Sequence, residues 1–173
     1  MLRLLLPLLF LAVALAQGEV PEHRLEGDPR PWVEAAWELV QNPKRFPANQ
    51  VATLPPGTPH AGMRVYEYVN LKLGDRTFET VILAVREGEE GEDFVLELTP
   101  GAKGKPIAPE ELGDVLLIGQ GPNYWVFRIL EGPFKGHFLV WSTATGHRGA
   151  GGEAIRIYAP KTLRRERGFS LVG

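Results

Sequence analysis

The densest group of chemically capable side chains lies between Gly136 and Glu153. It comprises His137, Trp141, Ser142, Thr143, Thr145, His147, Arg148 and Glu153, interspersed with Gly146, Gly149, Gly151 and Gly152. Such side chains serve as nucleophiles, metal ligands or anion donors, and each chemistry requires its own spacing.

The spacing disfavours nucleophilic catalysis and metal binding. A Ser-His-acid site requires a serine on a sharp turn, but Ser142 lies in an alternating strand pattern without the G-x-S-x-G motif. His137 and His147 are ten residues apart and form neither H-x-H nor H-x-x-x-H. We therefore expect no metal site and no cofactor.

Three residues of this stretch also match the letters of a dinucleotide-binding motif. Gly149, Gly151 and Ala154 fit G-x-G-x-x-A, but the residues that follow, 155–158, alternate as a strand. The motif requires glycines that open a helix, so that backbone N–H groups face a pyrophosphate. The match is therefore spurious.

A glycine-rich connection between two strands is the interpretation left for this segment, either purely structural or ligand-binding. Arg148 supplies a permanently charged, planar set of donors, and neighbouring glycines leave backbone N–H groups accessible. We therefore take His147, Arg148 and Trp141 as candidate ligand-binding residues for a small anionic ligand or an envelope component. A rival hypothesis is a hydrolase whose site is drawn from the 137–153 segment: His137, His147, Arg148 and Glu153.

A helix must precede the strands. Apolar residues recur at helical spacing in Trp32, Val33, Ala36, Trp37 and Val40, after a proline suited to a first helical turn. This pattern predicts a helix from Pro31 to Gln41 that buries both tryptophans beneath a sheet. The proline-rich stretch 46–59 has no periodicity and predicts an irregular connection.

The period then changes from 3.6 to 2, which is typical of strands. Strands are predicted at 65–73, 77–86, 94–98, 115–118, 124–130, 136–143 and 154–158, with a turn at Gly74-Asp75 and one helical turn at 109–112. Short strands without intervening helices indicate a mainly β fold, an antiparallel sandwich or a partly open barrel of about seven or eight strands with one N-terminal helix. Residues 161–173 are predicted to form a final strand or a docked tail.

Three further groups have both a functional and a structural interpretation. Tyr66 and Tyr68 suit stacking on sugars or bases, although tyrosine also favours half-buried strand positions. The acidic stretch 87–93 offers carboxylates for calcium, but it lacks the order of an EF-hand loop, which favours a solvated loop. Three arginines near the end, Arg164, Arg165 and Arg167, are interpreted as a solvated group.

The N-terminus has the pattern of a secretory signal. Arg3 precedes an apolar run of about a dozen residues, and Ala14 and Ala16 supply the small residues of an A-x-A cleavage site before Gln17. We expect a signal peptide over 1–16, with an uncleaved anchor as the alternative, an extended leader over 17–30 and one domain over 31–173. No later stretch is apolar enough to span a bilayer, so the predicted location is secreted, periplasmic or envelope-bound.

The amino-acid composition further limits the classes of function that are possible. The formal net charge of −2 disfavours a nucleic-acid binder, and the chain contains no cysteine to form disulfides. Its many Pro, Gly, Glu, Arg and Leu residues, with no Cys and few Asn, Gln and Met, are typical of a thermophile. The sequence predicts an exported, non-catalytic binding or accessory module and leaves its ligand and oligomeric state open.

Overall fold

The computed structural model describes residues 27–142 and 154–167, and its strands belong to one antiparallel sheet. The strands are β1 (Gln50–Thr53), β2 (Arg64–Leu73), β3 (Arg76–Val85), β4 (Phe94–Thr99), β5 (Val115–Gly121), β6 (Tyr124–Ile129), β7 (Phe138–Ser142) and β8 (Ala154–Tyr158). Their order is β1-β2-β3-β4-β8-β7-β6-β5, with β1 and β5 at the two edges. The predicted mainly β, antiparallel fold is confirmed, in the form of one open sheet.

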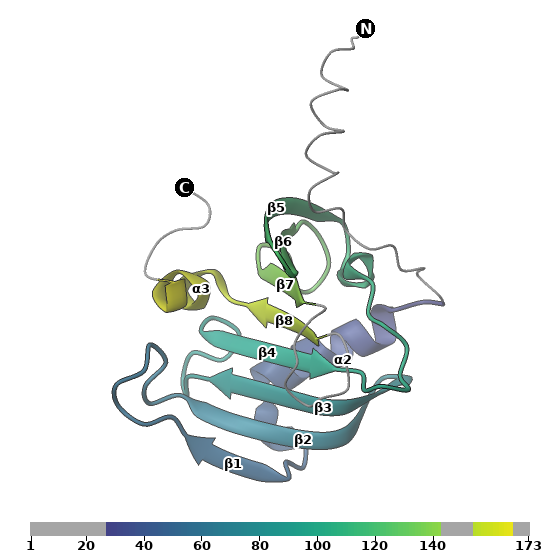
Figure 1. Ribbon diagram of the computed structural model, residues 1–173. Coiled ribbons are helices and arrows are strands. Elements are labelled where there is room, and N and C mark those ends of the chain that lie inside the picture. Colours follow the sequence, from purple (N-terminus) through teal and green to yellow (C-terminus); the bar gives the residue numbers. More distant parts are fainter. Residues whose placement is uncertain (1–26, 143–153, 168–173) are drawn as a thin grey trace, which may run out of the picture.

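The sheet turns strongly along its width. In Figure 1, β5, β6 and β7 run across the direction of β1 to β4, and β8 joins the two parts. Right-handed strand twist accumulates over eight strands and produces such coiling. The resulting concave face provides room for a helix against one side of the sheet.

Helix α2 (Arg30–Gln41) fills that face and confirms the predicted helix to within one residue. Its apolar stripe is buried: Trp32, Val33, Ala36, Leu39 and Val40. The short 3-10 helix η1 (Pro43–Arg45) follows, because the proline at its start cannot continue an α-helix. Trp32 is 2% exposed as predicted, whereas Trp37 is only partly buried.

The opposite face of the sheet carries a smaller apolar cluster. Phe138 on β7 and Tyr158 on β8 are paired neighbours whose side chains point away from the main core, because side chains alternate along a strand. Leu163 of helix α3 (Pro160–Arg167) covers them. Of the two forms predicted for residues 161–173, the strand was wrong, because the described part of this stretch is helical, whereas its packing against the sheet agrees with a docked tail.

Two connections also differ from their predictions. Strand β1 lies inside the segment that was predicted to be irregular. All four of its residues are exposed, so it has no buried face that would produce an apolar–polar alternation in the sequence. The acidic loop 87–93 ends in a buried carboxylate, Asp93, which is 1% exposed. The predicted helical turn at 109–112 is confirmed as the 3-10 helix η2 (Pro109–Leu112).

Candidate functional site

The predicted ligand-binding residues fall into two groups. His147 and Arg148 lie outside the described residues, as does Glu153. Trp141 lies on β7 and is fully buried, with its ring centroid 5.3 Å from that of Trp125. Its indole is therefore part of the main core, and its proposed role toward a ligand stays an untested prediction.

His137, named in the hydrolase hypothesis, lies just before β7 against an aromatic cluster. Its ring centroid lies 5.7 Å from that of Trp37 and 5.3 Å from that of Phe94. Its Nδ1 lies 3.1 Å from the carbonyl oxygen of Phe134, so this nitrogen carries the proton and donates. The buried Nε2 has no hydrogen-bond partner among the described residues, which places its lone pair among aromatic rings rather than toward substrate.

The two neighbouring tyrosines of β2 serve the core. Tyr66 and Tyr68 are 5% and 0% exposed, and their rings stack at 6.4 Å. The Tyr68 hydroxyl donates a 2.9 Å hydrogen bond to the carbonyl oxygen of Pro43. Burial raises the pKa of Tyr68 above its ordinary value. These rings are not accessible as a platform for sugars or bases.

A cluster of charged side chains holds α3 against the β3–β4 loop. The Asp93 carboxylate accepts hydrogen bonds from Arg86 Nε at 2.9 Å, from Arg165 and from the Thr162 hydroxyl at 2.7 Å. Burial alone would raise the pKa of Asp93, but the hydrogen bonds from Arg165, Arg86 and Thr162 outweigh it and hold the pKa well below its ordinary value. The carboxylate is fully committed to protein partners and has no role as a calcium ligand here.

The same cluster continues to a histidine. His60 Nδ1 lies 3.3 Å from Arg165 Nη2, which can only donate, so Nδ1 accepts and Nε2 carries the proton. His60 Nε2 then donates to Glu166 Oε2 at 3.0 Å, and the Tyr158 hydroxyl donates to Glu166 Oε1 at 3.1 Å. Each side-chain nitrogen of His60 and each carboxylate oxygen of Glu166 thus has a protein partner, which favours a structural role for the two residues.

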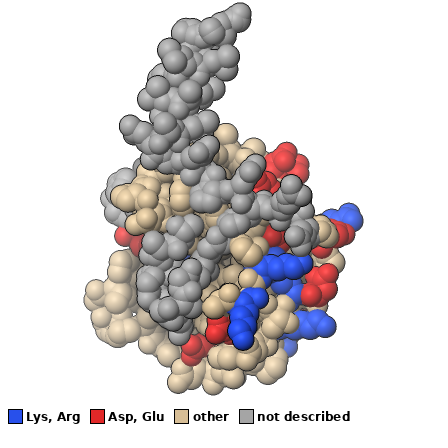
Figure 2. All heavy atoms as spheres, turned by 45° about the vertical axis from the view of Figure 1, so that its right-hand side comes forward, with Lys and Arg blue, Asp and Glu red and all other residues tan. Residues whose placement is uncertain are grey.

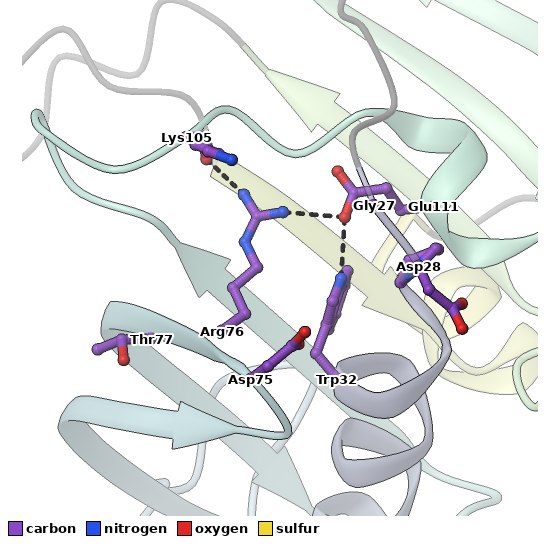
Figure 3. A pocket seen from close by; sticks show the side chains of 9 residues that line it. Gly27, Asp28, Trp32, Asp75, Arg76, Thr77, Lys105 and Glu111 are labelled. Atoms are coloured by element: carbon purple, nitrogen blue, oxygen red, sulfur yellow. Dashed lines mark hydrogen bonds and ion pairs between the residues drawn. The ribbon is translucent and has the colours of Figure 1, made fainter.

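A polar pocket lies at the start of α2, beside the β2–β3 turn and the segment before η2 (Figure 3). Its volume is about 550 Å³, within the usual range for small-molecule sites. Six polar or charged side chains line it, together with Trp32: Asp28, Asp75, Arg76, Thr77, Lys105 and Glu111. Their sequence positions are up to 83 residues apart, so the topology brings them together.

A buried ion pair forms the back of this pocket. Arg76 Nη1 donates to Glu111 Oε1 at 2.9 Å, and the two side chains are 17% and 7% exposed. The same Glu111 oxygen accepts the Trp32 indole N–H at 2.8 Å, and Oε2 accepts the backbone N–H of Ala108 at 2.9 Å. Figure 3 shows Arg76 reaching from β3 toward Glu111, with Trp32 between α2 and the carboxylate. The acid is thereby held in one orientation.

The guanidinium of Arg76 is fixed from its other side as well. Nη2 donates to the carbonyl oxygens of Lys105 and Pro106, the latter at 3.2 Å. Its Cζ lies 5.8 Å from the Trp32 ring centroid and 5.4 Å from that of Phe78, within cation–π range. The Nε–H and one Nη1–H have no acceptor within residues 27–142 and 154–167.

The charged surface is mixed in sign. Figure 2 shows basic and acidic side chains next to one another on the face that it presents, rather than a patch of one sign. Within the described ranges, no group of three or more acidic or histidine side chains is arranged to hold a metal ion. Nor does any helix in the described part of the chain combine the length and apolarity needed to cross a bilayer.

Comparison with known protein families, curated proteins and solved structures finds no match to this chain. The site must therefore be assessed from its geometry. The pocket could not be predicted from the sequence, because Arg76 lies between a predicted turn and a predicted strand with no motif around it, and the spacing of Trp32 indicates only a core residue. One local signal was present in the sequence. Glu111 lies three residues after Ala108, at a helical turn that begins with a proline, and at this spacing a glutamate side chain can accept the backbone N–H of the residue that precedes the turn.

Proposed function

We propose that this chain is exported and acts without catalysis as a binding or accessory module of the cell envelope or extracellular space. Its N-terminal pattern supports export: a basic residue, an apolar run and an A-x-A site before Gln17. The polar pocket at the start of α2 supports binding and is the proposed ligand site.

The Arg76–Glu111 pair is the observation that carries this proposal. A general acid or base must exchange protons with a substrate. Glu111 instead uses both oxygens on fixed protein donors, and Arg76 does not lose its proton at physiological pH. Both side chains are rigid and largely buried, so they present a preorganised polar wall, which favours recognition over proton transfer.

The hydrolase hypothesis has less support. Of its four residues, the structure describes only His137, whose ring faces Trp37, Phe94 and Phe134. His147, Arg148 and Glu153 lie outside the described residues, so this alternative stays a prediction. The anionic ligand expected for His147 and Arg148 also stays a prediction.

Export is tested by expressing the full chain in a bacterial host and measuring the intact mass of the protein recovered from the envelope or medium. Processing before Gln17 is the expected result. A retained Met1 in the recovered protein would instead favour an N-terminal anchor.

Binding is tested by NMR with a mixed library of saccharides, organic acids, amines and nucleotides. We expect a bound compound to shift the indole N–H resonance of Trp32, which lies at the pocket's back wall. Asp75→Ala removes an exposed pocket carboxylate of the β2–β3 turn without touching the core, and Glu79→Gln on the adjoining strand β3 is the control outside the pocket. Absence of binding by every class, or turnover of a bound compound, would contradict the proposal.

A further inference from the structure

We infer that the pocket at the start of α2 takes a neutral, polyhydroxylated ligand, a saccharide or polyol, and this inference rests on the proposed function. The pocket's own charges are the first reason. Three carboxylates, Asp28, Asp75 and Glu111, and two cations, Arg76 and Lys105, belong to its lining, and Asp28 is itself paired with Arg30 at 2.8 Å. The lining is therefore close to neutral, and no single charge sign dominates it.

An anionic ligand fits this lining poorly. Arg76 is the best-placed cation, but its charge is already opposed by Glu111 at 2.9 Å. Hydrogen bonds from Arg30 lower the pKa of Asp28 to about 2, so this carboxylate is ionised at neutral pH. Arg30 offsets much of that charge, but an added carboxylate or phosphate would still lie near the exposed Asp75, and like charges at short range are costly in a partly enclosed site.

A cationic ligand fits no better. The buried Glu111 already accepts from Trp32, Arg76 and the Ala108 backbone. An ammonium at Glu111 would have to displace Arg76 from a pair that is mostly buried, and an ammonium at the exposed Asp75 would stand beside the permanent charge of the neighbouring Arg76. Breaking a buried ion pair leaves an uncompensated charge and is strongly unfavourable.

Hydroxyl groups match what the pocket offers. Arg76 retains N–H groups without an acceptor in the described part of the chain, and Asp75 and Thr77 lie exposed on the same rim. The lining thus offers both hydrogen-bond donors and acceptors. A hydroxyl both donates and accepts, so a polyol satisfies both kinds of group without introducing a charge.

The ring of Trp32 does not serve as a stacking platform for this ligand. It is 2% exposed, and its face is already covered by the Arg76 guanidinium at 5.8 Å. Recognition must therefore come from hydrogen bonds to the edges of the ligand. This predicts selectivity for the pattern of hydroxyl groups rather than for aromatic or flat compounds.

Isothermal titration calorimetry on the full chain tests the inference with maltose and sorbitol as neutral probes, citrate and inorganic phosphate as anions, and putrescine as a cation. At least one neutral probe is expected to bind, with an affinity that changes less than about twofold between low and high salt, because screening acts on charged ligands. Asp75→Ala should weaken that binding about tenfold, the loss expected for a hydrogen bond to a charged group. Glu79→Gln should leave it unchanged.

The outcomes separate this inference from the proposed function. Tight binding of citrate, phosphate or putrescine alone, sensitive to Asp75→Ala, would overturn the ligand class and leave the binding function standing. Binding of a neutral probe that Asp75→Ala does not alter would overturn the assignment to this pocket. If no probe binds and the broader NMR library also fails, both the ligand class and the binding function are overturned.

Discussion

The guanidinium of Arg165 donates to both oxygens of Asp93, at 2.8 Å to Oδ1 and 3.1 Å to Oδ2, across 72 residues of sequence. This bidentate contact joins the last helix, α3, to the loop between β3 and β4. The Thr162 hydroxyl strengthens the connection because it donates to Asp93 while accepting the backbone N–H of Phe94 at 3.0 Å. Helix α3 is thus fixed by a buried polar cluster as well as by Leu163.

Asp93→Asn should lower the free energy of unfolding by about 3 kcal/mol. The substitution keeps the shape of the side chain but removes the charge that faces Arg86 and Arg165. Both arginines are about one-third exposed, 31% and 32%, so water compensates part of the loss and the effect falls at the low end for a buried pair. Urea denaturation followed by tryptophan fluorescence measures it.

Glu92→Gln is the matched control, because it neutralises an exposed carboxylate in the same loop. Its effect should stay within about 0.5 kcal/mol, as for most surface substitutions. Equal effects of the two variants would show that the loop's net charge, rather than the Asp93 contacts, stabilises the fold.

The stabilisation from Asp93 should depend on pH in the acid range. Its folded-state pKa is held below the unfolded value near 3.9, so folding favours the ionised form. The contribution is therefore fully present above that unfolded value, and it is lost as pH falls toward the lower folded-state pKa. The difference in unfolding free energy between wild type and Asp93→Asn should be constant from about pH 5 to 7 and shrink below pH 4. Denaturation curves at pH 7, 5, 4 and 3 test this, and a constant difference would contradict it.

Tyr158 should make the stability of the fold depend on pH in the alkaline range. Burial, together with the nearby Glu166 carboxylate, raises the pKa of Tyr158 to about 12. The unfolded chain ionises tyrosine near pH 10, so stability should fall as pH rises from about 10 to 12. Spectrophotometric titration of the native protein should show late ionisation from both Tyr68 and Tyr158, and Tyr158→Phe should lose the Tyr158 part while keeping that of Tyr68. If Tyr158→Phe instead loses absorbance change near pH 10 and keeps the whole late phase, this hydroxyl lies in a more exposed site.

The two helix tryptophans should differ in their effect on stability. Trp32→Ala should cost about 3–5 kcal/mol, because the ring is almost fully buried and its N–H is bonded to Glu111. Trp37 contacts Phe94 and Phe134 but is only partly buried, so Trp37→Ala should cost at least about 1 kcal/mol less. Chemical denaturation of both variants provides the comparison. A larger loss for Trp37→Ala would mean that the aromatic cluster around His137 contributes more than the helix contact with β3.

Much of the architecture could be predicted from the sequence because it depends on local periodicity. The helix over 31–41 and the strands with alternating burial follow from the spacing of apolar residues, as β4 shows with its strict buried and half-buried alternation. Strand β1 was not predicted, because an exposed edge strand has no buried face and therefore no alternation of apolar and polar residues. Helix α3 was not predicted as a helix, because it is short and highly charged. Its one apolar contact residue, Leu163, does not define a helical spacing of apolar residues.

The polar sites could not be predicted for a different reason. Arg76 and Glu111 are 35 residues apart, and Asp93 and Arg165 are 72 apart. Their pairing depends on how the strands are ordered in the sheet, which local spacing does not determine. The segment favoured by composition, 142–153, lies almost entirely outside the described residues, and the pocket lies at the start of α2.

The contact between Gly74 and the start of α2 leads to the last prediction. Gly74 lies in the β2–β3 turn with φ of +61°, a conformation that costs other residues about 1 kcal/mol or more. A Cβ at this position would lie 2.6 Å from the carbonyl carbon of Pro31 and 2.7 Å from the backbone nitrogen of Trp32. These are backbone atoms of the first helical turn, so they cannot rotate away as a side chain would.

Gly74→Ala should therefore destabilise the fold by the φ penalty plus about 1–3 kcal/mol for overpacking, and it should displace the start of α2 from the pocket. Gly57→Ala is the matched control, because Gly57 also has a positive φ, +95°, but has nothing within 4 Å of its Cβ position. Only Gly74→Ala should shift the Trp32 indole resonance, since only this turn presses on the helix that carries Trp32. Equal losses of stability in the two variants, with an unmoved Trp32 signal, would mean that the turn and the helix do not pack as closely as their backbones indicate.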